Sequence, residues 1–191
     1  MIATSLLQGS RVRLTALTAN DLPEIARWHD DAGFARMFDA RPAAPRTAGT
    51  LDSWLEDYSR STNGFLFAIR PLDSDELLGY TELEGILWPH QHAWLSIAIG
   101  DPARQGQGYG AEAIGLVLQF AFQELNLHRV QLTVFSYNQR AIGLYEKLGF
   151  RREGTYREHL QRDGQRYDMY IYGMLRPEWL ALDQPPQDAG G

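Results

Sequence analysis

Residues 95–110 read Leu95-Ser-Ile-Ala-Ile-Gly-Asp-Pro-Ala-Arg-Gln-Gly-Gln-Gly-Tyr-Gly110, and this stretch organises the rest of the chain. An apolar run ends at Gly100-Asp101-Pro102, a loop with alternating glycines follows, and a helical pattern begins at Ala111. Glycine allows φ > 0 and lets a ligand approach the backbone closely. The start of a helix offers unpaired N–H groups and a positive dipole end, which bind anions. Because a plain strand-to-helix connection needs only one glycine, the stretch favours a phosphate-binding loop.

Two known phosphate-binding patterns fit this loop poorly. A P-loop requires Lys followed by Ser or Thr, which the chain lacks here. The dinucleotide pattern Gly-x-Gly-x-x-Gly/Ala is satisfied through Gly106, Gly108 and Ala111. That pattern also needs an acidic residue about 20 positions further on, and neither Asn126 nor the strand end at Phe135-Ser136 supplies one. A nucleotide-dependent oxidoreductase is therefore only a distant alternative.

Composition limits the class of protein. The chain has 191 residues, 44% of them hydrophobic, which suits one globular domain, expected over residues 1–182, with a flexible tail at 183–191. It has no run of about 18 apolar residues and no basic, apolar leader, so we expect neither a membrane span nor a signal peptide. The absence of cysteine fits a reducing cytoplasm. A net charge of −6 argues against nucleic acid as a partner and favours a cationic substrate.

The order of elements predicts a mixed α/β sheet. Periodicity indicates strands at 11–17, 65–70, 77–87, 94–99, 129–135, 150–161 and 165–175. It indicates helices at 18–31, 47–60, 111–125, 139–148 and 176–182, whereas 32–46, rich in Ala, Arg and Pro, is predicted to be a loop. Hairpins combined with one β-α-β crossover require a mixed sheet covered by helices on both faces.

A second motif makes a family resemblance specific. Phe135-Ser-Tyr-Asn-Gln-Arg-Ala-Ile-Gly-Leu-Tyr-Glu-Lys-Leu-Gly-Phe150 resembles the signature Asn-x-x-Ala-x-x-x-Tyr-x-Lys-x-Gly-Phe of GNAT acetyltransferases. The glycine loop resembles their acetyl-CoA loop, Gln/Arg-x-x-Gly-x-Gly/Ala, with Gln105 where Arg is common. The C-terminal part, around 162–168 and 175–179, is similar to the branch of ribosomal-protein N-terminal acetyltransferases and their polyamine- and antibiotic-modifying relatives.

The resemblance implies a fold, a co-substrate and a set of site residues. The fold would be a single GNAT-like domain, with a mostly antiparallel mixed sheet of about seven strands, about four flanking helices, and a splayed parallel pair at 94–99 and 129–135. The backbone of Ile97, Ala98 and Ile99 would bind the pantetheine arm of acetyl-CoA, and Asn138 would contact the coenzyme. Tyr145 would protonate the departing thiolate. The pyrophosphate would lie on the N–H groups of Gln105, Gly106, Gln107, Gly108, Tyr109 and Gly110.

Each of these side chains also has a structural interpretation. Asn138 can serve solely as a helix N-cap, and Tyr145 falls on the apolar face of its helix. The attacking amine must lose a proton, and a carboxylate is a plausible base. Glu82 and Glu84 project from one face of the strand before the coenzyme strand, although an exposed sheet face would explain each of them alone. We expect no metal site, because no histidine has a metal-ligating companion at a useful spacing.

These observations predict a cytoplasmic N-acetyltransferase, monomeric or homodimeric. The acceptor would be a primary amine of a protein or peptide N-terminus, a polyamine, an amino acid or an aminoglycoside. Residues 1–100, expected to border the acceptor, hold 13 acidic and 8 basic side chains, whereas 101–191 hold 11 and 10. The closest alternative is a non-catalytic acyl-CoA sensor on the same fold.

Overall fold

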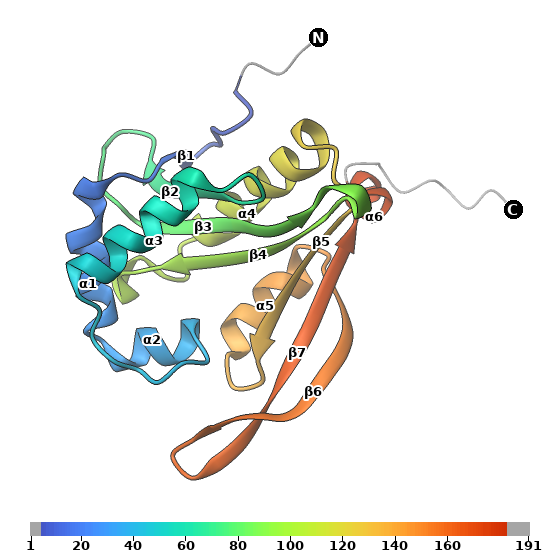
Figure 1. Cartoon of the computed structure of the whole chain (residues 1–191). Helices are drawn as coiled ribbons and strands as arrows, with labels where there is room; N and C mark the ends of the chain where they lie inside the picture. Colours follow the sequence, from blue (N-terminus) through green and yellow to red (C-terminus); the bar gives the residue numbers. More distant parts are fainter. Residues whose placement is uncertain (1–4, 183–191) are drawn as a thin grey trace, which may run out of the picture.

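A computed structural model describes residues 5–182, which form a seven-stranded sheet with strand order β1-β2-β3-β4-β5-β7-β6 (Figure 1). Every neighbouring pair is antiparallel except β4 and β5. The strands are β1 Val12–Ala16, β2 Phe65–Pro71, β3 Gly79–Leu87, β4 His92–Ile99, β5 Arg129–Phe135, β6 Arg151–Arg162 and β7 Gln165–Leu175. The predicted strand count and the mixed sheet are confirmed.

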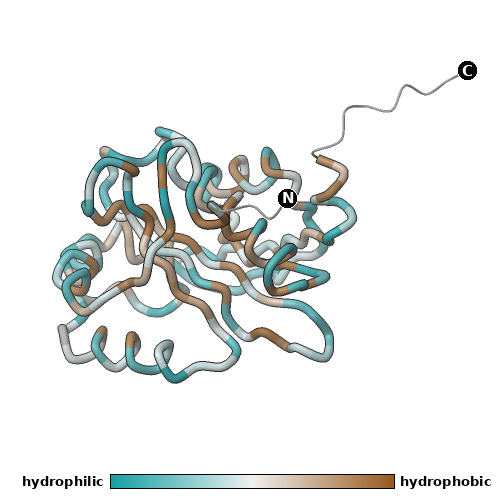
Figure 2. The backbone as a smooth tube through the Cα atoms, turned by 90° about the horizontal axis from the view of Figure 1, so that it is seen from above, coloured by the Kyte–Doolittle hydropathy of each residue, from teal (hydrophilic) through white to brown (hydrophobic). Residues whose placement is uncertain are grey.

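Helices cover both faces of the sheet. They are α1 Leu22–His29, α2 Ala32–Phe38, α3 Ala48–Arg60, α4 Tyr109–Gln119, α5 Gln139–Lys147 and α6 Arg176–Leu182. The larger core cluster joins α4 and α5 to one face, and a smaller cluster joins α1 and α3 to the other. Figure 2 shows the hydrophobic segments gathered in the interior of the molecule and the hydrophilic ones on its outer turns.

The two parallel strands diverge soon after they meet. Only three residue pairs join β4 to β5, from His92↔Arg129 to Trp94↔Gln131. Beyond Trp94 the strands separate, so the edge of β4 that faces β5 has no strand partner from Leu95 to Ile99 (Figure 1). The splayed parallel pair expected from the family resemblance is confirmed, and it opens a gap in the middle of the sheet.

The prediction of a loop over 32–46 is wrong for its first half. Residues Ala32–Phe38 form α2, capped by Asp31, whose side chain accepts from the Gly33 N–H at 2.7 Å. At the other end of α2, Arg162 of the β6–β7 hairpin donates to the carbonyls of residues 39, 40 and 41 at 2.9, 3.2 and 3.0 Å. With α2 the described part of the chain has six α-helices, where periodicity indicates five and the family resemblance implies about four.

The expected tail at 183–191 lies outside the described residues. Within residues 5–182, no helix combines the length and the apolar character that crossing a bilayer requires.

Candidate active site

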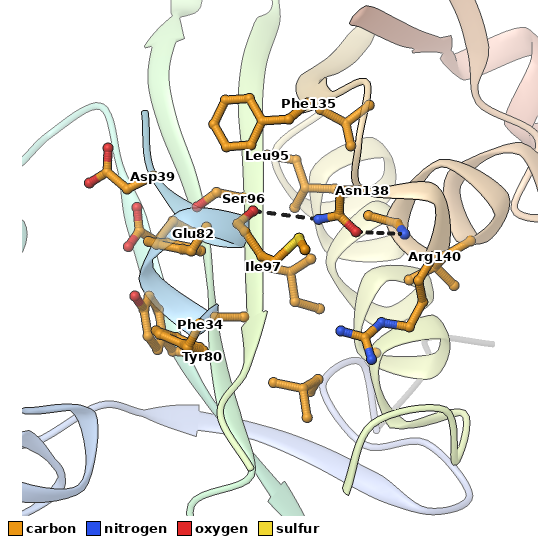
Figure 3. Close-up of a pocket in the computed structure, with 18 of the residues that line it drawn as sticks. Phe34, Asp39, Tyr80, Glu82, Leu95, Ser96, Ile97, Phe135, Asn138 and Arg140 are labelled. Carbon is orange, nitrogen blue, oxygen red and sulfur yellow. Dashed lines mark hydrogen bonds between the residues drawn. The ribbon is translucent and has the colours of Figure 1, made fainter. Parts of the chain in front are cut away.

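A cavity of about 990 Å³ fills the gap between the diverging strands. One wall comes from the glycine loop, β4 and α5, and the other from α2, α3 and β3. Figure 3 shows Phe34, Tyr80 and Glu82 on one side of this cavity, with Asn138 and Arg140 on the opposite side. The cavity therefore has two differently built walls, which face each other.

The glycine loop lies at the end of β4 and leads into α4. Gly106 and Gly108 have φ of +76° and +91°, a region that L side chains rarely adopt, and Gly108 is the N-cap of α4. Gly110 lies in the first turn, where a Cβ would meet Leu144 of α5 at 3.8 Å. Since the first turn of a helix leaves its N–H groups unpaired, this end of the cavity is built to hold an anion.

Side chains around the loop hold its shape. Gln105 donates from Nε2 to the Ile99 carbonyl at 2.8 Å, and Gln107 donates to the Ala103 carbonyl at 2.6 Å. The guanidinium of Arg11 donates to the Gln107 carbonyl at 2.8 Å. Both glutamine side chains are thus occupied within the protein, and the Gln105 N–H donates to the Pro102 carbonyl at 3.2 Å. The backbone N–H groups of residues 106–110 are therefore the donors that the loop offers a ligand.

Positive side chains border the same end. Arg104 lines the cavity but is paired with Glu76 at 2.8 Å. Arg140 and Lys147 also line the cavity, and neither has an ion-pair partner among residues 5–182. They lie one turn before and one turn after Leu144, the residue beside Gly110, so they flank the loop from α5. They give this end of the cavity two positive charges that no described acidic side chain pairs with.

Residues 97–99 of β4 face the gap along the cavity. Ile97, Ala98 and Ile99 pair with β3 on one side, at Thr81, Tyr80 and Gly79. All three line the cavity on the side where β5 has turned away. An extended ligand can lie along this edge as an additional strand would.

Asn138 has the role of a helix cap. Its Oδ1 accepts from the Ala141 N–H at 3.2 Å, at the start of α5. Its Nδ2 donates to the Met37 carbonyl of α2 at 3.4 Å (Figure 3). The predicted cap is confirmed, and the same side chain joins α5 to α2 across the cavity.

The two strand carboxylates differ sharply in environment. Glu82 is 8% exposed and accepts from the Tyr58 hydroxyl at 2.9 Å, whereas Glu84 is exposed and lies 3.5 Å from the same hydroxyl. Burial, with a smaller contribution from the negative charge of Glu84, raises the pKa of Glu82 to about 7. The exposed-face interpretation holds for Glu84 and is wrong for Glu82.

Tyr145 belongs to the core and also borders the cavity. It is 7% exposed and packs edge-on against Phe150, with ring centroids 5.8 Å apart. No described residue hydrogen-bonds its hydroxyl, and burial raises its pKa to about 12. The phenol therefore keeps its proton at neutral pH and has that proton available to donate.

Some cavity residues were not identified from the sequence. In the sequence, Tyr58 fits the apolar face of the predicted helix at 47–60 together with Leu51 and Trp54, and nothing there indicates that its hydroxyl joins both carboxylates. The ring-bearing residues Phe34 and Phe38 fell in the predicted loop, where their spacing of four was the available sign of a helix face.

Comparison with known proteins agrees with this geometry. The family model described as the acetyltransferase (GNAT) domain matches residues 11–151. The SPbeta prophage-derived uncharacterized N-acetyltransferase YokL of Bacillus subtilis is 32% identical over 71% of this chain and 75% of its own length. The ribosomal protein uS5-alanine N-acetyltransferase of Escherichia coli is 25% identical over 65% of this chain and 64% of its own length.

A solved structure shares the fold. The crystal structure of spermidine N-acetyltransferase from Vibrio cholerae, in complex with CoA and spermine, matches with a TM-score of 0.82 and 26% identity. The match covers 90% of this chain and 99% of that one. With the splayed strands, the glycine loop and the segment 135–150 in place, the chain belongs to the GNAT family of N-acetyltransferases.

Proposed function

We propose that this enzyme transfers the acetyl group of acetyl-CoA to a primary amine by direct attack within a ternary complex. One observation carries the proposal. Glu82, a buried carboxylate whose pKa lies near 7, lines the same cavity as the glycine loop at the start of α4. A group that can accept a proton at neutral pH thus shares a cavity with an anion-binding loop, which is the pairing that amine acetylation requires.

The coenzyme is proposed to lie along β4 from the loop inward. Its pyrophosphate would bind the N–H groups from Gly106 to Gly110, since the Gln105 N–H already donates to Pro102, and Arg140 and Lys147 line the same cavity. Its pantetheine arm would follow the free edge of β4 at residues 97–99, and would pass Asn138. The presence of CoA in the related Vibrio cholerae structure supports this placement.

The chemistry then needs one base and one acid. Glu82 takes a proton from the ammonium, which frees the nitrogen lone pair. The amine nitrogen attacks the thioester carbonyl carbon, a C–N bond forms, the C–S bond breaks, and the nitrogen releases its second proton to solvent. Tyr145 hydrogen-bonds the departing sulfur and passes it a proton as the C–S bond breaks. Because the pKa of Tyr145, about 12, lies above the 8.5 or so of an ordinary thiol, the tyrosinate then regains a proton from solvent. Glu84, at the exposed end of the carboxylate pair, attracts the incoming cation.

Two alternatives make different predictions. A non-catalytic sensor would bind acetyl-CoA and release no thiol with any amine. A nucleotide-dependent oxidoreductase would bind NAD, yet β5 ends at Phe135 and Ser136 follows it, so no acid is available there for a ribose hydroxyl. Titration calorimetry with CoA and with NAD tests the coenzyme: we expect CoA alone to bind. NAD binding without CoA binding would overturn the proposal.

The loop itself can be tested by replacing Gly108 with valine. A Cβ at residue 108 would come within 3.3 Å of the Arg11 guanidinium, which donates to the Gln107 carbonyl, and the φ of +91° suits glycine. The loop N–H groups should therefore shift, and CoA should bind about tenfold more weakly or worse. The left-handed conformation costs a non-glycine residue about 1–2 kcal/mol, which a folded domain tolerates. The matched control is Gly115→Ala in α4, where an added Cβ meets nothing within 4 Å and affinity should be unchanged. Unaltered CoA affinity in folded Gly108→Val would place the phosphates elsewhere.

A further inference from the structure

The wall opposite the coenzyme side carries a continuous row of aromatic rings. Neighbouring ring centroids lie 6.0 Å apart for Phe34 and Phe38, 5.6 Å for Phe38 and Tyr80, 5.4 Å for Tyr80 and Trp54, and 6.0 Å for Trp54 and Tyr58. All five line the cavity, and together they link α2, β3 and α3. We call these five residues the aromatic wall. Such a surface binds apolar groups, and aromatic ones most of all.

Negative charge is concentrated at one end of this wall. The Tyr58 hydroxyl joins Glu82 and Glu84, so two carboxylates meet at the last ring of the row. The other two acidic residues of the cavity are already engaged. Asp39 is paired with both Arg41 and Arg46, and Asp31 caps α2.

The rest of the wall offers no counterion for a second positive charge. Although burial acts to raise it, hydrogen bonds and charge from Arg41, aided by Arg46, hold the pKa of Asp39 below its usual range. The guanidiniums of Arg41 and Arg46 border the cavity and would repel a second ammonium. Behind Phe34 and Phe38 lies His29, whose pKa burial lowers to about 4, so that it is neutral at pH 7.

We propose that the acceptor is a monoamine with an apolar body, an alkyl or arylalkyl amine, whose ammonium meets Glu82, Glu84 and Tyr58 while its body packs on the aromatic wall. This inference rests on the proposed acetyl transfer and narrows its substrate class. It sets the enzyme apart from the relative crystallised with spermine, since a polyamine carries further ammonium groups along its chain. Those groups would leave water for a wall of rings and guanidiniums.

A chain-length series measures the contribution of the wall. Each methylene buried against it should raise kcat/KM about fourfold, from propylamine to pentylamine, because burial of a CH₂ is worth about 0.8 kcal/mol. Phenethylamine should match or exceed pentylamine. Cadaverine, which has the pentylamine chain with a second amine at its far end, should be at least about tenfold poorer than pentylamine, and spermidine poorer still.

Variants connect the preference to the wall. Trp54→Leu removes the ring between Tyr80 and Tyr58. It should lower kcat/KM for phenethylamine about tenfold and leave CoA affinity unchanged, since the substrate loses both an aromatic contact and buried apolar area. Trp88→Leu is the matched control, because Trp88 is exposed, lies outside the cavity, and should leave both values unchanged. CoA binding reports whether each variant is folded. The chain-length series uses the unmodified enzyme, so its result does not depend on the folding of these two variants.

The outcomes separate this inference from the proposed function. Acetylation of cadaverine, spermidine or a peptide N-terminus as efficient as that of pentylamine would overturn the monoamine assignment while leaving acetyl transfer intact. A flat chain-length series would do the same. If no amine were acetylated, both the monoamine assignment and the proposed acetyl transfer would be wrong.

Discussion

Replacing Glu82 with glutamine should lower kcat by about 10²- to 10⁴-fold, the usual contribution of a positioned base. Glutamine keeps the size of the side chain and can still hydrogen-bond Tyr58, but it cannot accept the proton of the ammonium. Steady-state rates at saturating acetyl-CoA and amine measure the effect. The affinity for CoA should change little, because Glu82 lies on the wall opposite the coenzyme side (Figure 3).

The pH dependence identifies this carboxylate more specifically. The base acts only when ionised, so kcat should fall as the pH drops below about 7, the pKa of Glu82. We call this low-pH fall of kcat the acid limb. In Glu84→Gln the nearby negative charge is removed, the pKa of Glu82 falls, and the acid limb moves to lower pH. In Tyr58→Phe the hydrogen bond to the carboxylate is lost, the pKa rises, and the limb moves to higher pH.

Two controls guard this interpretation. The acid limb of kcat should stay at the same pH when the acceptor is exchanged for an amine of different pKa, because the group that titrates is Glu82 and not the substrate. Glu56→Gln, on the exposed part of α3 and paired with Arg60, should leave the profile unchanged. Wild-type activity in Glu82→Gln, or a limb that follows the substrate amine, would show that Glu82 is not the base.

Replacing Tyr145 with phenylalanine should also lower kcat by about 10²- to 10⁴-fold if its hydroxyl protonates the thiolate. The ring, its volume and its contact with Phe150 are retained, and no hydrogen bond within the described chain is lost. The free energy of unfolding should therefore change little, and KM for acetyl-CoA should move much less than kcat. Stopped-time assays of thiol release and denaturant unfolding measure the two effects.

Tyr172→Phe is the matched control for this substitution. Tyr172 is buried near Tyr145, but it donates its hydroxyl proton to Glu146 at 2.8 Å and does not line the cavity. Its replacement should cost about 0.5–1.5 kcal/mol of stability and leave kcat intact. A kcat for Tyr145→Phe within about twofold of the parent would leave Tyr145 as a packing residue, with the thiolate departing unassisted.

The parts of the fold that follow local patterns could be predicted from the sequence. The strands alternate, α4 carries a wide apolar stripe, and Asn138 caps α5 in the way its position suggests. Helix α2 was not predicted because distant residues stabilise it. Phe38 packs on Tyr80, and the Tyr137 hydroxyl donates to the Arg36 carbonyl in the last turn. Arg162 of the far hairpin holds the segment that follows the helix. A short segment rich in Ala, Arg and Pro carries no local sign of those contacts.

The site was predictable on its coenzyme side and less so on its acceptor side. The glycine loop directly follows β4 in the sequence, so the spacing of residues within this one stretch is enough to predict the coenzyme side. Glu82 and Glu84 look equivalent in the sequence, and only the length of β2 separates them. The β2 pairing ends at Phe65↔Leu83, so Glu82 has a neighbouring strand on that side and Glu84 does not. The contact of the Tyr58 hydroxyl with Glu82 and Glu84 depends on how α3 packs over β3, and no local sequence pattern indicates that packing.

The most direct test of the account is release of free CoA thiol from acetyl-CoA by the purified enzyme, measured with and without a primary amine. Mass spectrometry of the same reactions should identify the amide. The account predicts that release requires the amine and equals the amide formed, mole for mole. Binding of acetyl-CoA with no thiol release for any of a panel of alkylamines, polyamines, aminoglycosides and peptide N-termini would contradict it and leave a sensor in place of an enzyme.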